Sequence, residues 1–148
     1  MKNQLKNEGF TLIELLLVIT ILGILAAIAI PRLYPQTEKA RVGEALSILG
    51  AIRQGQEAYF LRKGSYANCP ARCLSQSGFN DCWENNLGME HPTCSSTYFN
   101  YATFPVGNGF QAVATRIPDD LPNYGGSWII LDETGTYSGT HPLGPNPD

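Results

Sequence analysis

One unbroken hydrophobic stretch, residues 10–30, dominates the pattern of apolar and polar positions along the chain. It holds 21 consecutive residues with one ionisable side chain, Glu14, and no proline. A helix of this length covers about 32 Å at ~1.5 Å per residue, close to the ~30 Å hydrocarbon core of a bilayer. Because unpaired backbone polar groups are costly in lipid, a lone segment of this kind is expected to be helical. The pattern therefore predicts a transmembrane helix over residues 10–30, surrounded by membrane lipid.

A helical period continues beyond this stretch, over residues 31–62. Apolar side chains recur there at steps of three, four and seven, which predicts an amphipathic helix with one half-buried face. Charged side chains such as Glu38 are expected mostly on the other face. A basic last turn followed by glycine, Arg62-Lys63-Gly64, indicates where the helix ends. The stripe consists of Val42, Ala45, Leu46, Leu49, Ile52 and Tyr59.

Two prolines, Pro31 and Pro35, stand where the hydrophobic stretch gives way to the amphipathic one. Pro31 has no N–H to donate to the carbonyl of Ala27, and its ring crowds the preceding turn. We therefore expect a kink or a loosened turn between residues 27 and 36, within one long helix.

The second half of the chain changes to patterns that favour strands. Residues 63–96 show no clear period and are rich in Gly, Pro, Asn, Ser and Cys, so we expect an irregular, cysteine-containing loop region. Residues 97–138 alternate in a way that predicts a small antiparallel sheet, opening with a hairpin around an Asn-Gly turn in residues 106–109. Residues 139–148 hold three prolines and two glycines, which predicts a frayed, flexible tail. The predicted strands are residues 97–104, 110–117 and 127–132, with a short fourth at 136–138.

These elements together predict an α+β fold, in which one long N-terminal helix packs by its apolar stripe on the sheet. A length of 148 residues suits one domain plus an anchor. The net charge is −3, and without residues 1–9, which contain Lys2, Lys6 and Glu8, 8 basic residues face 12 acidic ones, giving −4. Because the chain has no basic run, nothing indicates nucleic acid as a partner.

Four cysteines lie in the irregular region: Cys69, Cys73, Cys82 and Cys94. An even number in a small exported domain implies disulfides, and three pairings are open. Zinc is the alternative, because Cys69-x-x-x-Cys73 together with His91-x-x-Cys94 could supply four ligands. The irregular spacings and the oxidising compartment favour disulfides over a metal.

Catalytic chemistry has little support in this sequence. Both histidines, His91 and His141, sit in proline-containing segments and belong to no recognisable nucleophile–base set. No glycine-rich phosphate loop follows a strand. The pair Asp119-Asp120 is better explained as a solvated loop than as a cation site. We therefore expect no cofactor, no metal and no enzymatic activity.

The residues before the hydrophobic stretch carry a specific motif. Residues 1–9 form a short polar leader that ends in Gly9, directly against Phe10. The sequence Gly9-Phe10-Thr11-Leu12-Ile13-Glu14 resembles the processing and methylation motif of type IV prepilins. A secretory signal would have a shorter apolar region, and a simple membrane anchor would give Glu14 no purpose. Glu8 departs from the resemblance, since this family more often has a basic residue before the glycine.

The resemblance implies how the protein would be processed and used. Prepilin peptidase would cut between Gly9 and Phe10, and the same enzyme would methylate the new amine of Phe10. The subunit would wait in the inner membrane and pass, through an inner-membrane assembly platform, into a cell-surface or periplasmic helical filament of identical or homologous pilins. There the carboxylate of Glu14 would pair with the Phe10 amine of an adjoining subunit. The alternatives are a pseudopilin of type II secretion and a membrane-anchored binding domain.

Overall fold

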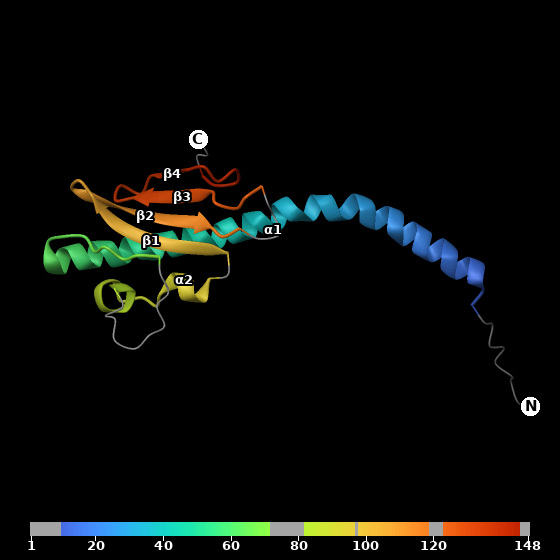
Figure 1. Cartoon of the computed structure of the whole chain (residues 1–148), viewed down its shortest axis with the longest axis horizontal. Helices are drawn as coiled ribbons and strands as arrows, with labels where there is room; N and C mark the ends of the chain where they lie inside the picture. The colour runs from blue at the N-terminus through green and yellow to red at the C-terminus, as the bar shows by residue number, and fades with distance from the viewer. Residues whose placement is uncertain (1–9, 72–81, 97, 119–122, 146–148) are drawn as a thin grey trace, which may run out of the picture. The chain divides into compact units, whose positions relative to one another are not determined.

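The computed structural model describes residues 10–71, 82–96, 98–118 and 123–145, so Gly9, Cys73 and the Asp119-Asp120 pair lie outside the described residues. The chain divides into two units, residues 1–37 and residues 38–148, and each is treated by itself. The first contains the start of helix α1 (Leu12–Lys63), and the second contains the rest of that helix and the sheet (Figure 1).

Helix α1 is 52 residues long and begins in the predicted transmembrane stretch. The helical assignment continues through Pro31 and Pro35, so neither proline ends the helix. The predicted kink between residues 27 and 36 remains a prediction. The helix ends at Lys63, and Gly64 follows with φ of +71°, which is the left-handed conformation that glycine adopts most readily after a helix.

The predicted antiparallel sheet is confirmed, with four strands in the order β1-β2-β3-β4 (Figure 1). One detail differs from the prediction: the hairpin corner is Gly107-Asn108, while Gly109 already belongs to the second strand and pairs with Val106. Gly107 has φ of +57°, so glycine takes the left-handed position at the first corner residue. The strands are β1 (Phe99–Val106), β2 (Gly109–Arg116), β3 (Trp128–Asp132) and β4 (Tyr137–Gly139).

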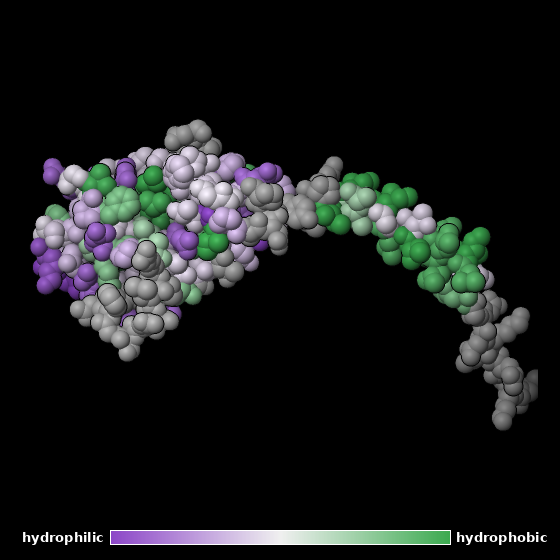
Figure 2. Space-filling view, viewed as in Figure 1, coloured by the Kyte–Doolittle hydropathy of each residue, from purple (hydrophilic) through white to green (hydrophobic). Residues whose placement is uncertain are grey.

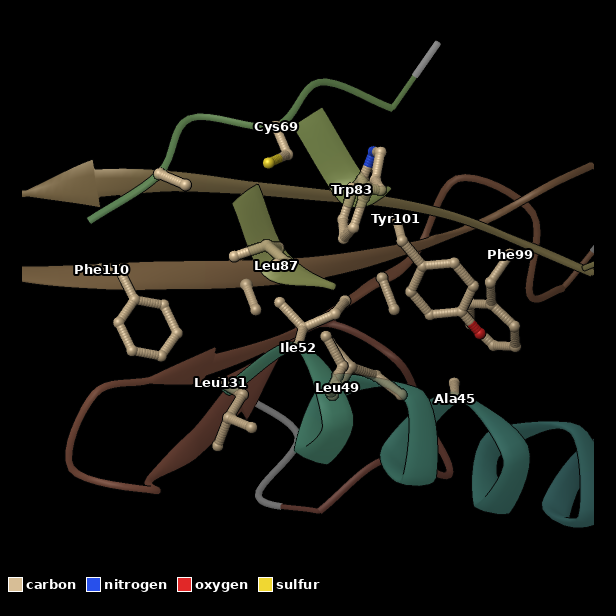
Figure 3. Close-up of a cluster of buried hydrophobic side chains, with 14 of the residues drawn as sticks. Ala45, Leu49, Ile52, Cys69, Trp83, Leu87, Phe99, Tyr101, Phe110 and Leu131 are labelled. Carbon is tan, nitrogen blue, oxygen red and sulfur yellow. The ribbon is translucent and has the colours of Figure 1, made fainter. Parts of the chain in front are cut away.

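The core lies between the second half of α1 and one face of the sheet (Figure 3). From the helix, Ala45, Leu49 and Ile52 are fully buried, as the stripe predicts. Alternate residues of the strands face them, because successive side chains of a strand point to opposite faces. The largest contributions from the sheet are Phe99, Tyr101, Phe110, Ile129 and Leu131.

The region expected to be irregular contains two short helices, η1 (Trp83–Leu87) and α2 (Pro92–Ser95). Trp83 and Leu87 are buried in the core, so η1 is held by packing. Helices of five and four residues are too short to produce a period in the sequence, which explains why the pattern did not predict them.

The tail expected to fray from residue 139 is instead ordered at its start. Gly139 belongs to β4, and His141 is 1% exposed. The physical reason is a polar contact that the sequence pattern does not reveal, because His141 lies beside the carboxylate of Glu38 at 3.2 Å.

Candidate functional site

The most unusual surface of the protein is the apolar start of α1. Over Leu12–Ile30 the helix has a mean hydropathy of 2.8, and none of this segment is buried within the protein. Figure 2 shows hydrophobic residues covering this part of the helix. By length and composition the segment can cross a membrane. An apolar surface of this extent needs lipid or other protein around it.

Two polar side chains, Glu14 and Thr20, interrupt this apolar segment. The hydroxyl of Thr20 donates a hydrogen bond to the carbonyl of Leu16 at 2.7 Å, so the helix itself satisfies that donor. The carboxylate of Glu14 has no hydrogen-bond or ion-pair partner among the described residues. Glu14 is therefore the one side chain of this segment whose polar group must be satisfied from outside.

The backbone around Glu14 is a well-formed helix start. The Oγ1 of Thr11 accepts a hydrogen bond from the N–H of Glu14 at 3.3 Å, as expected of an N-cap threonine. Thr11-Leu12-Ile13-Glu14 has the spacing of a capping box, and Glu14 stands in the first turn, where a negative charge is favoured. Phe10, directly before this cap, is exposed.

The cysteine region contains a disulfide between Cys69 and Cys82, whose Cα atoms are 5.4 Å apart. Cys94 is also disulfide-bonded. The zinc alternative is wrong for Cys69, because its sulfur is bonded to another sulfur. Among the described residues, no group of three or more His, Cys, Asp or Glu side chains could hold a metal.

A cluster of buried charges, which the sequence analysis missed, lies in the second unit around Glu38. One guanidinium edge of Arg116 faces the Glu38 carboxylate: Nε donates to Oε1 at 2.7 Å, and Nη2 donates to Oε2 at 3.1 Å. Arg41 Nη1 donates to Oε2 at 3.2 Å. The remaining nitrogen of Arg116, Nη1, donates to the carbonyls of Tyr98 and Ile117. Glu38 and Arg116 are at most 1% exposed, so this is a fully desolvated, bidentate pair.

His141 completes this cluster as a neutral ring. Leu143 donates its backbone N–H to Nδ1 at 3.2 Å, so the ring proton is on Nε2, which donates to Glu38 Oε1. Burial lowers the pKa of His141, the Glu38 carboxylate partly opposes this, and the charge of Arg116 adds to the lowering. Burial alone would raise the pKa of Glu38, but the hydrogen bonds and charge of Arg116, helped by His141 and Arg41, hold that pKa below its ordinary value. The carboxylate is saturated with donors, so the cluster is a structural tie between α1, β2 and the segment after β4.

The signal for this cluster was present in the sequence. Glu38 stands four residues before Val42 and Gln56 stands four residues after Ile52, so both polar residues fall on the buried stripe of the helix. Gln56 is also fully buried. A polar residue on an apolar stripe indicates a buried hydrogen-bond partner, and here those partners come from distant parts of the chain.

Comparisons with known proteins agree with the motif at the start of the chain. Residues 5–30 match the family described as the prokaryotic N-terminal methylation motif. The fimbrial protein EcpB of Eikenella corrodens is 33% identical over 138 residues, which cover 90% of this chain and 84% of that protein. The type IV major pilin PilE of Neisseria gonorrhoeae is 34% identical over 93 residues, covering 62% of this chain and 56% of PilE.

A third relative matches over a shorter length. The type IV major pilin PilA of Myxococcus xanthus (strain DK1622) is 43% identical over 63 residues, covering 43% of this chain and 29% of PilA. The chain thus spans about a third to a half of the length of these two major pilins. No solved structure matches the chain significantly.

Proposed function

Since the chain belongs to the type IV pilin family, we propose that it is a structural subunit of a pilus-like filament, assembled from the inner membrane. The observation that carries this proposal is the exposed apolar helix over Leu12–Ile30 with Glu14 near its start. Curated relatives that are named as major pilins and as a fimbrial protein support the same role.

The apolar helix suits two successive environments. In the precursor, residues 12–30 would lie in the inner-membrane lipid, which matches their length and hydropathy. In the filament, the same surface would be covered by the helices of other subunits. Pro31 and Pro35 would let the helix adjust where its apolar and amphipathic parts meet, because proline removes one intrahelical hydrogen bond.

Glu14 is the part of this surface that would select the docking geometry. A carboxylate costs ~2.5 kcal/mol or more near the centre of a bilayer, so it is rarely kept there without a function. Cleavage between Gly9 and Phe10 by prepilin peptidase would create an amine four residues before Glu14, and methylation of that amine would leave its charge. In a packed filament, the Phe10 amine of an adjoining subunit is the partner of opposite charge. The pair would form only when two subunits dock in register.

Substitution of Glu14 tests this role, with Thr11 as the matched control. Glu14→Ala and Thr11→Ala are expressed with the native assembly machinery, and both the cleaved membrane protein and the sheared filaments are quantified. We expect Glu14→Ala to accumulate as cleaved membrane protein while filament yield falls by about tenfold or more, since removing one partner of a buried pair costs ~3–5 kcal/mol. Thr11→Ala removes the side-chain acceptor of the Glu14 N–H and keeps the charge, so its filament yield should stay near that of the wild type.

Two outcomes would contradict this assignment. Wild-type filament yield from Glu14→Ala would show that the carboxylate has no role in docking. Equal losses from Glu14→Ala and Thr11→Ala would mean that both residues act only by stabilising the start of the helix.

A further inference from the structure

The outer edge of strand β1 is covered by other parts of the same chain. Its partner β2 takes up one edge, so alternate residues of β1 point their N–H and C=O groups away from the sheet. Thr103 exchanges two backbone hydrogen bonds with Cys69, at 2.8 and 2.9 Å. Tyr101 donates its N–H to Oγ1 of Thr93 at 2.8 Å, and Phe99 donates its N–H to Oγ of Ser96 at 3.3 Å.

The next outward position along β1 is Pro105, which has no N–H. From Phe99 to Pro105, each residue that faces outward therefore either has a hydrogen-bonded N–H or, at Pro105, has no N–H. Proteins protect the edges of sheets in this way because an open edge pairs readily with another strand.

Protection matters here because β1 is uncharged. Residues 99–105, Phe-Asn-Tyr-Ala-Thr-Phe-Pro, contain three aromatic side chains and no ionisable group except the Tyr101 phenol. A tyrosine is neutral at physiological pH, and burial raises the pKa of Tyr101 further. Short segments with high strand propensity and no net charge pair with copies of themselves when their edge is open. The other end of the sheet, β4, is only three residues long and offers little edge of its own.

The cover over Thr103 is a short segment, residues 67–70, which we call the edge strap. Gln56 of α1 holds its first residue, donating to the carbonyl of Ala67 and accepting from its N–H, both at 2.8 Å. Trp83 Nε1 donates to the carbonyl of Pro70 at 3.2 Å. The disulfide from Cys69 to Cys82 attaches the edge strap covalently to the residue before η1.

We propose that the Cys69–Cys82 disulfide keeps the edge strap closed over β1, and that the edge it conceals pairs with β1 of a second copy of this chain when the disulfide is absent. A disulfide that closes a loop of this size restricts the conformations in which the edge strap is open far more than the closed conformation. The hydrogen bonds from Gln56 and Trp83 to the edge strap involve no cysteine atom, so they remain available when the disulfide is removed. This inference is independent of filament assembly, because it concerns residues of the sheet and the strap alone.

Hydrogen exchange of the full chain in detergent micelles tests the first half. The variant Cys69→Ala/Cys82→Ala removes the disulfide and needs no reductant. We expect the amide of Thr103 to exchange on the order of 100-fold faster than in the wild type. The amides of Ala102 and Phe104, which face β2, should exchange at unchanged rates. Thr93→Val is the matched control, because it should accelerate only Tyr101, whose N–H loses its acceptor.

Self-association tests the second half. Cys69→Ala/Cys82→Ala should form dimers or larger species as its concentration rises, while the wild type stays monomeric under the same conditions. Adding Thr103→Pro to that variant removes the outward N–H at the centre of the edge and should restore the monomer.

Unchanged exchange at Thr103 would overturn the proposal, since Gln56 and Trp83 would then suffice to hold the strap. Equal acceleration at Ala102 and Thr103 would overturn it by revealing general unfolding, and a monomer with a fast-exchanging Thr103 would overturn the pairing.

Discussion

Replacing Glu38 with glutamine removes the negative charge from the buried cluster at nearly constant size. Arg116, which is 1% exposed, then keeps its positive charge but loses the carboxylate that faces it. It loses a bidentate contact with distances of 2.7 and 3.1 Å to the two carboxylate oxygens. Removing one partner of a buried ion pair costs ~3–5 kcal/mol, because the remaining charge stays buried without compensation. We therefore expect Glu38→Gln to lower the free energy of unfolding by about 4 kcal/mol.

The matched control is Glu57→Gln, at the exposed end of another ion pair on the same helix. Its partner is Arg53 at 3.1 Å, and the two side chains are 51% and 37% exposed. Exposed pairs at this spacing contribute ~0.3–0.5 kcal/mol, so this substitution should have almost no effect. A double variant, Glu38→Gln with Arg116→Met, removes the positive charge of Arg116 as well and should recover part of the loss.

Unfolding by urea in detergent micelles at pH 7 provides the measurement. Trp83 is a suitable fluorescent reporter because it is 1% exposed in the folded protein. A loss below about 1 kcal/mol for Glu38→Gln, or a double variant less stable than the single one, would refute the view that Arg116 depends on this carboxylate.

Two further predictions follow from the same structure. Burial holds the pKa of His141 below its ordinary value of 6.5, so the unfolded chain binds a proton first and the free energy of unfolding should fall as the pH drops below about 6.5. The lowered pKa of Glu38 adds a second loss of stability below about pH 4.5. A urea midpoint that stays constant from pH 7 to pH 4 would contradict both pKa assignments. Thiol counting on the denatured, unreduced protein should find no free sulfhydryl, and peptide mapping should recover Cys69 linked to Cys82, whereas free thiols or bound zinc would contradict the disulfide framework.

Much of the fold could be predicted because it follows from periodic patterns. The 3.6-residue period marks the buried face of α1, and the alternation within residues 97–117 marks the hairpin. Both signals are local, since a helix or a hairpin is formed by neighbouring residues. The short helices η1 and α2 escaped prediction because their position depends on burying a few side chains, such as Trp83, and on the disulfide at Cys82.

The partners of Glu38 in the buried cluster could not be predicted, because they are distant in sequence. Glu38 and Arg116 are separated by 78 positions, and Glu38 and His141 by 103. Sequence patterns alone predict Glu38 on the polar face, although it lies on the stripe, and His141 in a frayed tail. A charge on an apolar stripe predicts that a partner exists, but only the three-dimensional fold identifies it.

Whether this chain is a processed subunit of a filament can be decided from the intact mass of the protein in sheared filaments. We expect filaments to contain this chain as a species that lacks residues 1–9, begins at Phe10 and carries one added methyl group. Disulfides do not obscure this result. A methyl group adds ~14 Da to the mass, whereas each disulfide lowers it by only ~2 Da. A chain that retains residues 1–9, or that is found in the membrane and never in the filament fraction, would exclude its role as a processed filament subunit.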